Sequence, residues 1–195
     1  MSCSARLPGL AAAAVALLAL AGCGGGAIGA DTPDSSGQSF VGSAYNSSTF
    51  RAGSRPVAPD IAGTTLTGQH LSLSAYRGSV VVINFWGSWC APCRAEAPDL
   101  SALATHYAGH GVRFLGVDIR DDPVGADAFT KDFNVTYPSL NDPSDALALA
   151  FRGTVPPAAI PTTLVIDRRG RIAARILGSV SYDSLRTLIT QVSRG

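Results

Sequence analysis

Residues 80–93 of this 195-residue chain, VVVINFWGSWCAPC, place an apolar run directly before two closely spaced cysteines. The run from Val80 to Trp86 is almost entirely β-branched, aliphatic or aromatic, which predicts a strand buried on both faces. A helix is expected to follow from near Cys90 to about Tyr107, with a break or kink at Pro98. The two cysteines therefore lie where a central strand turns into a helix.

The position of the cysteine pair indicates its chemistry. Cys90 lies among the unpaired N–H groups at the start of the helix, where the positive end of the helix dipole favours the thiolate form. Two intervening residues bring Cys93 within disulfide reach, and Pro92 restricts the loop between the two cysteines. We therefore expect a redox-active disulfide in which the Cys90 thiolate attacks a partner and Cys93 resolves the mixed disulfide.

The rest of the chain alternates between strand and helix patterns, which is typical of an α/β architecture. Helices are expected to begin after Asp122 and Asp142, because Asp caps a helix and the Pro that follows each one suits a first turn. Strands are expected at 60–65, 69–73, 112–117, 162–167 and 171–177, and helices at 123–133, 143–151 and from Ser181 to about Val192. This order predicts a central mixed sheet flanked by helices, with an N-terminal β-hairpin extension and an extra helix insertion.

The first 22 residues are typical of a bacterial lipoprotein signal peptide. A short positive region precedes an unbroken apolar run of twelve residues, Leu10 to Ala21, which is too short to span a bilayer. The segment that ends in Gly22-Cys23 resembles the cleavage site at which Cys23 becomes a lipidated N-terminus. An ordinary signal peptide with an incidental cysteine is the alternative. Residues 23–55 are rich in Gly and Ser and are expected to be a flexible linker before a domain at 56–195.

Charge and cysteine count narrow the class of function. The chain has 15 basic and 14 acidic residues, a formal net charge of +1, so its charge gives no sign of nucleic-acid binding. Four cysteines are present, and removal of residues 1–22 with acylation of Cys23 leaves Cys90 and Cys93 as the free pair. We therefore expect a redox pair rather than a structural disulfide, and neither a cofactor nor a metal site.

Two separated segments carry a family resemblance. Residues 84–98, NFWGSWCAPCRAEAP, and 160–167, IPTTLVID, resemble the membrane-anchored TlpA/ResA-like thiol-disulfide oxidoreductases of the thioredoxin superfamily, with an AhpC/TSA-redoxin-like domain. The resemblance extends over residues 56–195 and implies a thioredoxin fold. It also implies that Pro161 is cis and faces the sulfurs, and that Ile160 offers backbone hydrogen bonds to a partner.

The same resemblance assigns a substrate surface. Trp89 and Pro92 are expected to form this surface together with Ile160 and Pro161. The segment Pro156-Pro157-Ala158-Ala159 departs from the family pattern by lengthening the approach to Pro161, which leaves the shape of the substrate groove open.

Glu96 is a further candidate catalytic residue. It lies three residues after Cys93 on the same helix face, and it is the only Glu among the 14 acidic residues. Cytoplasmic thioredoxins carry a buried Asp at the position that Asn84 occupies here, and the TlpA/ResA-like proteins have a functional Glu that matches Glu96. A partly desolvated carboxyl group near the thiols has a raised pKa and could move protons. The alternative is an exposed first-turn acid that the helix dipole favours.

The resemblance also implies a biological role. We expect a monomeric disulfide reductase, lipid-anchored on the extracytoplasmic face of the cell membrane. Its partners would be exported proteins such as apocytochrome c, and a membrane thiol carrier would supply electrons. Oxidation of exported thiols is the main alternative, since a change of tens of millivolts reverses the equilibrium with a given partner.

Other classes of function fit the sequence less well. A thiol peroxidase typically has an isolated peroxidatic cysteine, whereas this chain has a closely spaced pair. A copper-assembly factor typically has a distant His, whereas no His follows His110 in this chain. A zinc site made by the cysteines with His106 and His110 is disfavoured. A helix from Cys90 would place His106 about 20 Å away.

Overall fold

The computed structural model describes residues 40–42, 46–156 and 159–195. The predicted signal peptide and Cys23 lie outside the described residues. No helix in the described part of the chain is both long and apolar enough to cross a membrane.

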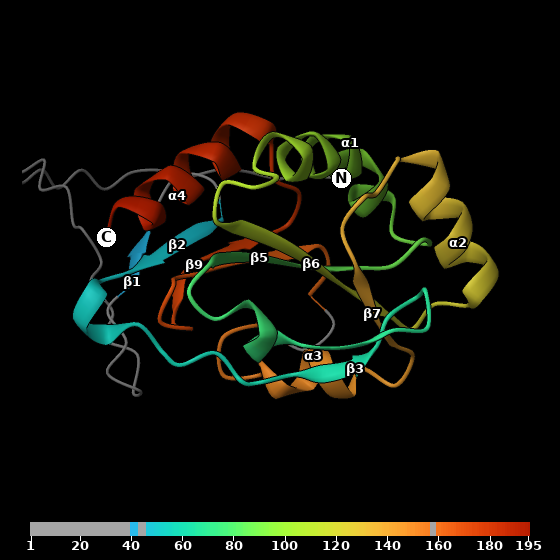
Figure 1. Cartoon of the computed structure of the whole chain (residues 1–195), viewed down its shortest axis with the longest axis horizontal. Helices are drawn as coiled ribbons and strands as arrows, with labels where there is room; N and C mark the ends of the chain where they lie inside the picture. Colours follow the sequence, from blue (N-terminus) through green and yellow to red (C-terminus); the bar gives the residue numbers. More distant parts are fainter. Residues whose placement is uncertain (1–39, 43–45, 157–158) are drawn as a thin grey trace, which may run out of the picture. The chain divides into compact units, whose positions relative to one another are not determined.

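A mixed sheet of seven strands forms the centre of the fold (Figure 1). Its strands lie in the order β1-β2-β9-β8-β5-β6-β7, with β5, β6 and β7 parallel and the other neighbours antiparallel. The strands are β1 (Phe40–Gly42), β2 (Ser47–Phe50), β5 (Val80–Trp86), β6 (Val112–Ile119), β7 (Ser139–Asp142), β8 (Thr162–Ile166) and β9 (Ile172–Leu177). The predicted N-terminal hairpin is present as a separate pair, β3 (Ala62–Thr64) and β4 (His70–Ser72).

Helices cover both faces of the sheet. In Figure 1, α1 and α4 lie along one face, and α3 lies with β3 on the other. The helices are α1 (Ala91–His106), α2 (Pro123–Asp132), α3 (Ala146–Ala150) and α4 (Tyr182–Arg194), with 3₁₀ turns η1 (Ala52–Ser54) and η2 (Leu73–Tyr76). This arrangement confirms the predicted α/β class with a mixed sheet between helices.

The central strand β5 divides the core into two parts. Val80 and Val82 pack with α1 and α4 on one face, whereas Ile83 and Phe85 pack with Phe151 on the other. Every residue of β5 is buried, as its almost entirely apolar sequence predicts. The buried strand fixes the place where the chain leaves the sheet, and therefore the place of the cysteines that follow.

The predicted linker is wrong at its C-terminal end. Residues 47–50 form β2, which extends the sheet by pairing with β9, and residues 40–42 pair with β2 as β1. The sequence of β2, Ser-Ser-Thr-Phe, lacks the alternation of apolar and polar residues that indicates a strand, and only Phe50 is buried in the structure. It becomes a strand because the edge of β9 offers unpaired backbone groups.

One helix prediction also needs correction. The helix expected from residue 143 begins only at Ala146, because the Asp142 carboxylate accepts a hydrogen bond from the Ala148 N–H (2.9 Å) and Asp142 itself ends β7. Of the break or kink expected at Pro98, the break does not occur, because α1 continues through this residue. By contrast, Asp122 caps α2 as predicted, with its carboxylate accepting from Val124 and Gly125.

Candidate active site

The two cysteines meet at the first turn of α1. Cys90 is the N-cap residue of the helix, and it is joined to Cys93 by a disulfide, with the Cα atoms 5.2 Å apart. The Cys93 N–H donates to the Cys90 sulfur at 3.2 Å. This contact brings an N–H donor of the helix terminus to the sulfur that would carry the negative charge after reduction.

The loop between β5 and α1 is held by residues that follow β6. Asp121 accepts hydrogen bonds from both the N–H and the hydroxyl of Ser88. The Trp89 indole N–H donates to the Arg120 carbonyl at 3.2 Å, and the Arg120 guanidinium lies over the Trp89 ring, 5.3 Å from its centroid. Trp89 is nevertheless 54% exposed. An exposed aromatic ring in a fixed orientation beside Cys90 is suited to contact a partner protein.

The loop around Pro161 completes the site. The Ile160–Pro161 peptide bond is cis, as predicted. Ile160 packs against a cluster of buried residues that contains both cysteines, so the two distant sequence segments do come together. The loop after β9 joins them, because Gly178 donates to the Pro161 carbonyl (2.8 Å) and the Ser179 hydroxyl donates to the Pro92 carbonyl (3.1 Å).

Glu96 is buried below the cysteines, with 2% of its surface exposed. One carboxylate oxygen accepts from the Asn84 amide and the other from the Val180 N–H, both at 2.8 Å. Burial raises the pKa of Glu96 to about 7, an effect that the two hydrogen bonds oppose and the charge of Asp99 reinforces. The alternative of an exposed first-turn acid is therefore wrong.

Three further residues of the site were not identified from the sequence. Arg120 and Asp121 orient the loop that carries Trp89, and Ser179 binds the backbone of Pro92. A pattern could have pointed to the first two, since loops after neighbouring parallel strands meet at the same sheet edge. Ser179 follows an antiparallel strand in a short turn, and its sequence carries no comparable sign.

Comparison with known proteins identifies the family. Residues 55–175 match the AhpC/TSA family. The chain belongs to the AhpC/TSA family. It is 35% identical over 128 residues to the thiol-disulfide oxidoreductase ResA of Geobacillus kaustophilus, which covers 66% of this chain and 71% of that protein. The corresponding ResA of Geobacillus thermodenitrificans is 33% identical over 129 residues, or 66% of this chain and 72% of that protein.

Solved structures agree with the sequence relatives. A secreted thiol-disulfide isomerase from Corynebacterium glutamicum superposes with a TM-score of 0.73 at 32% identity, covering 81% of this chain and 98% of that one. A DsbF homologue from Corynebacterium diphtheriae superposes with a TM-score of 0.71 at 36% identity, covering 79% and 98%. The fold of this AhpC/TSA member is thioredoxin-like, and the protein is a thiol-disulfide oxidoreductase of the ResA/DsbE type.

Proposed function

We propose that this oxidoreductase works outside the cytoplasm, where it reduces disulfides in exported proteins such as apocytochrome c before haem attachment. A membrane thiol carrier would supply its electrons. The observation that carries the proposal is the Cys90–Cys93 disulfide at the first turn of α1, beside the cis-Pro161 loop and above the buried Glu96. The similarity to a secreted isomerase supports an extracytoplasmic location.

The reaction proceeds by two thiol-disulfide exchanges. In the reduced protein, the Cys90 thiolate attacks one sulfur of the substrate disulfide, forming a mixed disulfide and releasing the other substrate sulfur as a thiolate. The Cys93 thiolate then attacks the Cys90 sulfur, which forms the Cys90–Cys93 disulfide and releases the second substrate thiolate. Two electrons pass to the substrate, whose two thiolates take up protons.

Glu96 moves a proton between these two steps. Cys93 must lose its proton before it can attack, and Glu96 lies three residues further along the same helix. A pKa of about 7 leaves comparable fractions of Glu96 protonated and ionised near neutral pH, which suits a general acid and base. The bonds from Asn84 and Val180 hold the carboxylate oxygens, so its position does not depend on solvent.

The substrate binds over Trp89, Pro92, Ile160 and Pro161. An extended substrate segment would lie beside Ile160 and use its backbone groups for hydrogen bonds. Pro92 is exposed between the cysteines, and its carbonyl is already bonded to Ser179, so it offers the substrate a fixed apolar contact.

The membrane anchor is proposed at Cys23. Cleavage before this residue and acylation of its sulfur and amine would tether the domain to the outer face of the cytoplasmic membrane. Intact mass of the membrane-extracted protein tests this point. If Cys23 is the anchor, the measured mass should correspond to loss of residues 1–22 and addition of acyl chains. A Cys23→Ser variant should be released from the membrane.

A trapping experiment tests the proposed chemistry. The Cys93→Ser variant should accumulate a mixed disulfide between Cys90 and the substrate protein, because the resolving thiol is missing. Cys90→Ser should trap nothing. The substrate class is identified if the reduced wild-type protein converts the disulfide of an apocytochrome c peptide into two thiols. Equal trapping by the two variants would contradict the assignment of Cys90 as the attacking residue.

A further inference from the structure

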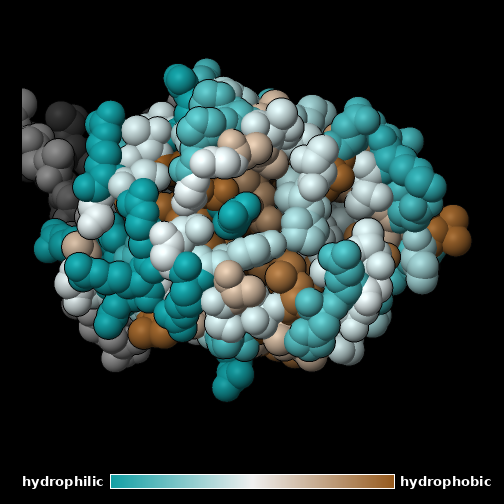
Figure 2. Space-filling view, in the orientation of Figure 1, coloured by the Kyte–Doolittle hydropathy of each residue, from teal (hydrophilic) through white to brown (hydrophobic). Residues whose placement is uncertain are grey.

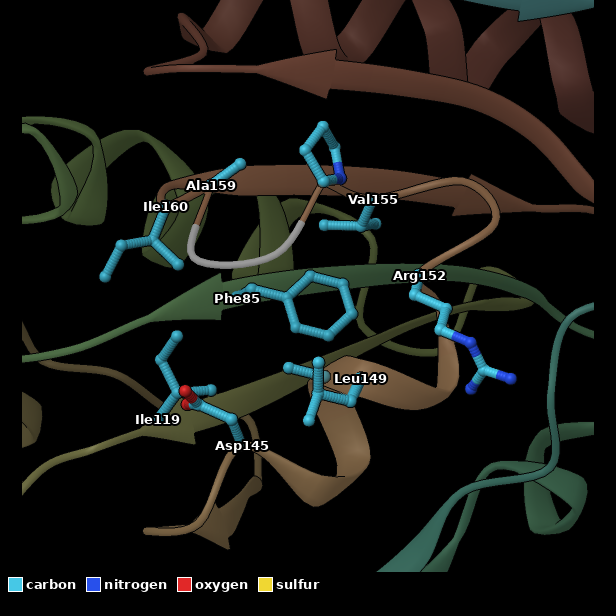
Figure 3. Close-up of a pocket in the computed structure, with 10 residues that line it drawn as sticks. Phe85, Ile119, Asp145, Leu149, Arg152, Val155, Ala159 and Ile160 are labelled. Atoms are coloured by element: carbon cyan, nitrogen blue, oxygen red, sulfur yellow. The ribbon is translucent and has the colours of Figure 1, made fainter.

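An apolar cavity lies beside the cis-proline loop, on the face of the sheet opposite α1. Its volume is about 110 Å³. Eight of its ten lining residues are apolar: Phe85, Ile119, Ala148, Leu149, Val155, Pro156, Ala159 and Ile160. Figure 3 shows the Phe85 ring at the centre, with Leu149 of α3 on one side and Ala159 and Ile160 on the other. The proposed exchange chemistry makes no use of this cavity.

Ile160 lies between the cavity and the active site. This residue lines the cavity and also packs against the cluster that contains Cys90 and Cys93. It immediately precedes the cis-Pro161 peptide bond. A substrate segment bound beside Ile160 would therefore lie close to the cavity.

An unusual ion pair connects the cavity to Trp89. Asp145 lines the cavity, and one of its carboxylate oxygens binds the Arg120 guanidinium at 3.0 Å. Arg120 is the residue that stacks on Trp89 and accepts its indole hydrogen bond. Arg120 and Asp145 both have left-handed backbone conformations, with φ of 49° and 61°. Such conformations are unfavourable for residues with side chains and are found preferentially at functional sites.

The other oxygen of Asp145 is buried and has no hydrogen-bond partner among the described residues. A buried acceptor without a donor is unfavourable, so a ligand that supplies an N–H group would stabilise it. Arg152, on the far side of the cavity in Figure 3, directs its guanidinium away from Phe85. The cavity thus has a largely apolar wall, with the Asp145 carboxylate at its edge.

Exposed apolar residues are few in the parts of the chain that the structure describes. The large ones are Val57, Trp89, Val124 and Leu149. Figure 2 shows the hydrophobic residues on the face in view as small separate groups. Trp89 and Leu149 belong to the active site and to the cavity wall, respectively. Arg120 contacts Trp89 and also binds Asp145, which lines the same cavity as Leu149. Trp89 and Leu149 therefore belong to one connected part of the surface, to which a single polypeptide could bind.

We propose that the cavity is a specificity subsite, which receives an aliphatic side chain of the substrate polypeptide close to the cysteine that Cys90 attacks. The size fits a Leu or Met side chain, since a cavity of about 150 Å³ accommodates a benzene molecule. This inference rests on the proposed function and adds a substrate preference to it.

Peptide disulfides of matched sequence test the subsite. The reduced full-length protein is offered mixed disulfides of glutathione with peptides that carry Leu, Ser or Asp at each of three positions on either side of the cysteine. At one position, Leu should lower KM about tenfold relative to Ser and leave kcat unchanged. Asp at that position should bind more weakly than Ser, because a charge would enter an apolar site.

Two variants locate the preference in the cavity. Leu149→Asp should abolish the preference by placing a charge in the wall, and Ala148→Phe should abolish it by filling the space. Val124→Asp is the matched control, because Val124 is also exposed and apolar but lies on α2 outside the cavity, and it should retain the preference. Far-ultraviolet circular dichroism confirms that each variant is folded.

Reduction of glutathione disulfide separates this inference from the proposed function. It should depend on Cys90 and be the same in wild type and Leu149→Asp, since this disulfide carries no aliphatic side chain. If wild type reduces it without any preference among the peptides, the subsite is contradicted and the exchange chemistry stands. If wild type reduces no disulfide at all, the proposed function itself fails. A change in oligomeric state of Leu149→Asp with an unchanged peptide preference would mean that the cavity binds a second copy, and would also overturn the subsite.

Discussion

Two buried carboxyl groups, Glu96 on α1 and Asp118 on β6, show how similar burial can have different consequences. Their exposed fractions are 2% and 1%, and burial is the main reason that the pKa of each is raised, to about 7 and about 8. Both oxygens of Glu96 accept hydrogen bonds. One oxygen of Asp118 has no partner among the described residues, and the neighbouring Asp121, Asp122 and Asp142 raise its pKa further.

The difference teaches that a raised pKa does not by itself identify a catalytic acid. Glu96 lies on the same helix as Cys93, and donors from β5 and from the loop after β9 hold its carboxylate in place. Asp118 lies opposite Trp86 in the sheet and has no part in the proposed exchange. Its raised pKa should instead appear as a dependence of stability on pH.

The largest expected effect is on catalysis. Glu96→Gln should lower the rate of disulfide reduction at pH 7 about a hundredfold, because a positioned general acid and base contributes at least that much. The inflection near pH 7 in the rate profile should disappear as well. Stopped-flow kinetics of a reduced protein with a peptide disulfide measures both quantities. Asp118→Asn is the matched control and should keep the rate and the inflection of wild type. A similar loss of rate in both variants would contradict the assignment of a catalytic role to Glu96 alone.

The second effect is on stability, and its sign follows from the raised pKa of Asp118. The folded protein keeps this proton up to about pH 8, whereas the unfolded chain loses it near the ordinary value of 3.8. Stability from this group is therefore complete below pH 4 and is lost as pH rises towards 8. Asp118→Asn should reduce the loss of unfolding free energy between pH 5 and pH 8 by about 4 kcal/mol.

Urea denaturation of the oxidised protein at several pH values measures this difference. Asp127→Asn serves as a control, because Asp127 is an exposed acid on α2 in an ion pair with Lys131. It should leave the pH dependence of stability as it is in wild type. An unchanged slope in Asp118→Asn would mean that Asp118 is ionised in the folded protein.

The smallest expected effect concerns the hydrogen bond between Asn84 and Glu96. This bond lowers the pKa of Glu96, so Asn84→Ala should move the inflection of the rate profile upward by about one pH unit. Thr163→Val removes the acceptor that Asn84 uses on its other side but leaves the bond to Glu96, and it should not move the inflection. A downward shift in Asn84→Ala would contradict the assigned bond.

The sequence predicted the parts of the site that are encoded locally. The strand β5, the helix that follows it and the spacing of Cys90, Cys93 and Glu96 are all contained within one continuous segment, residues 80–106. Because local periodicity fixes these elements, their mutual placement could be anticipated. The cis-Pro161 was predicted as well, although that expectation came from the family resemblance and not from any pattern in the chain.

The remaining parts depend on contacts between distant residues. β2 is a strand only because β9 lies beside it, and α3 begins late because the Asp142 carboxylate takes a hydrogen bond inside the helix. The pair of Arg120 and Asp145 joins the end of β6 to the start of α3. Tertiary contacts of this kind override local preferences, and a single sequence contains no sign of them.

The reduction potential of the Cys90–Cys93 couple tests the central claim most directly, since it decides the direction of exchange. Equilibration of the full-length protein with glutathione buffers, followed by alkylation and mass spectrometry, measures it. We expect a value near that of thioredoxin, about −270 mV, which would make the protein a reductant. A value near about −120 mV, typical of strong periplasmic oxidants, would contradict the proposed reductase and make the protein an oxidase of exported thiols.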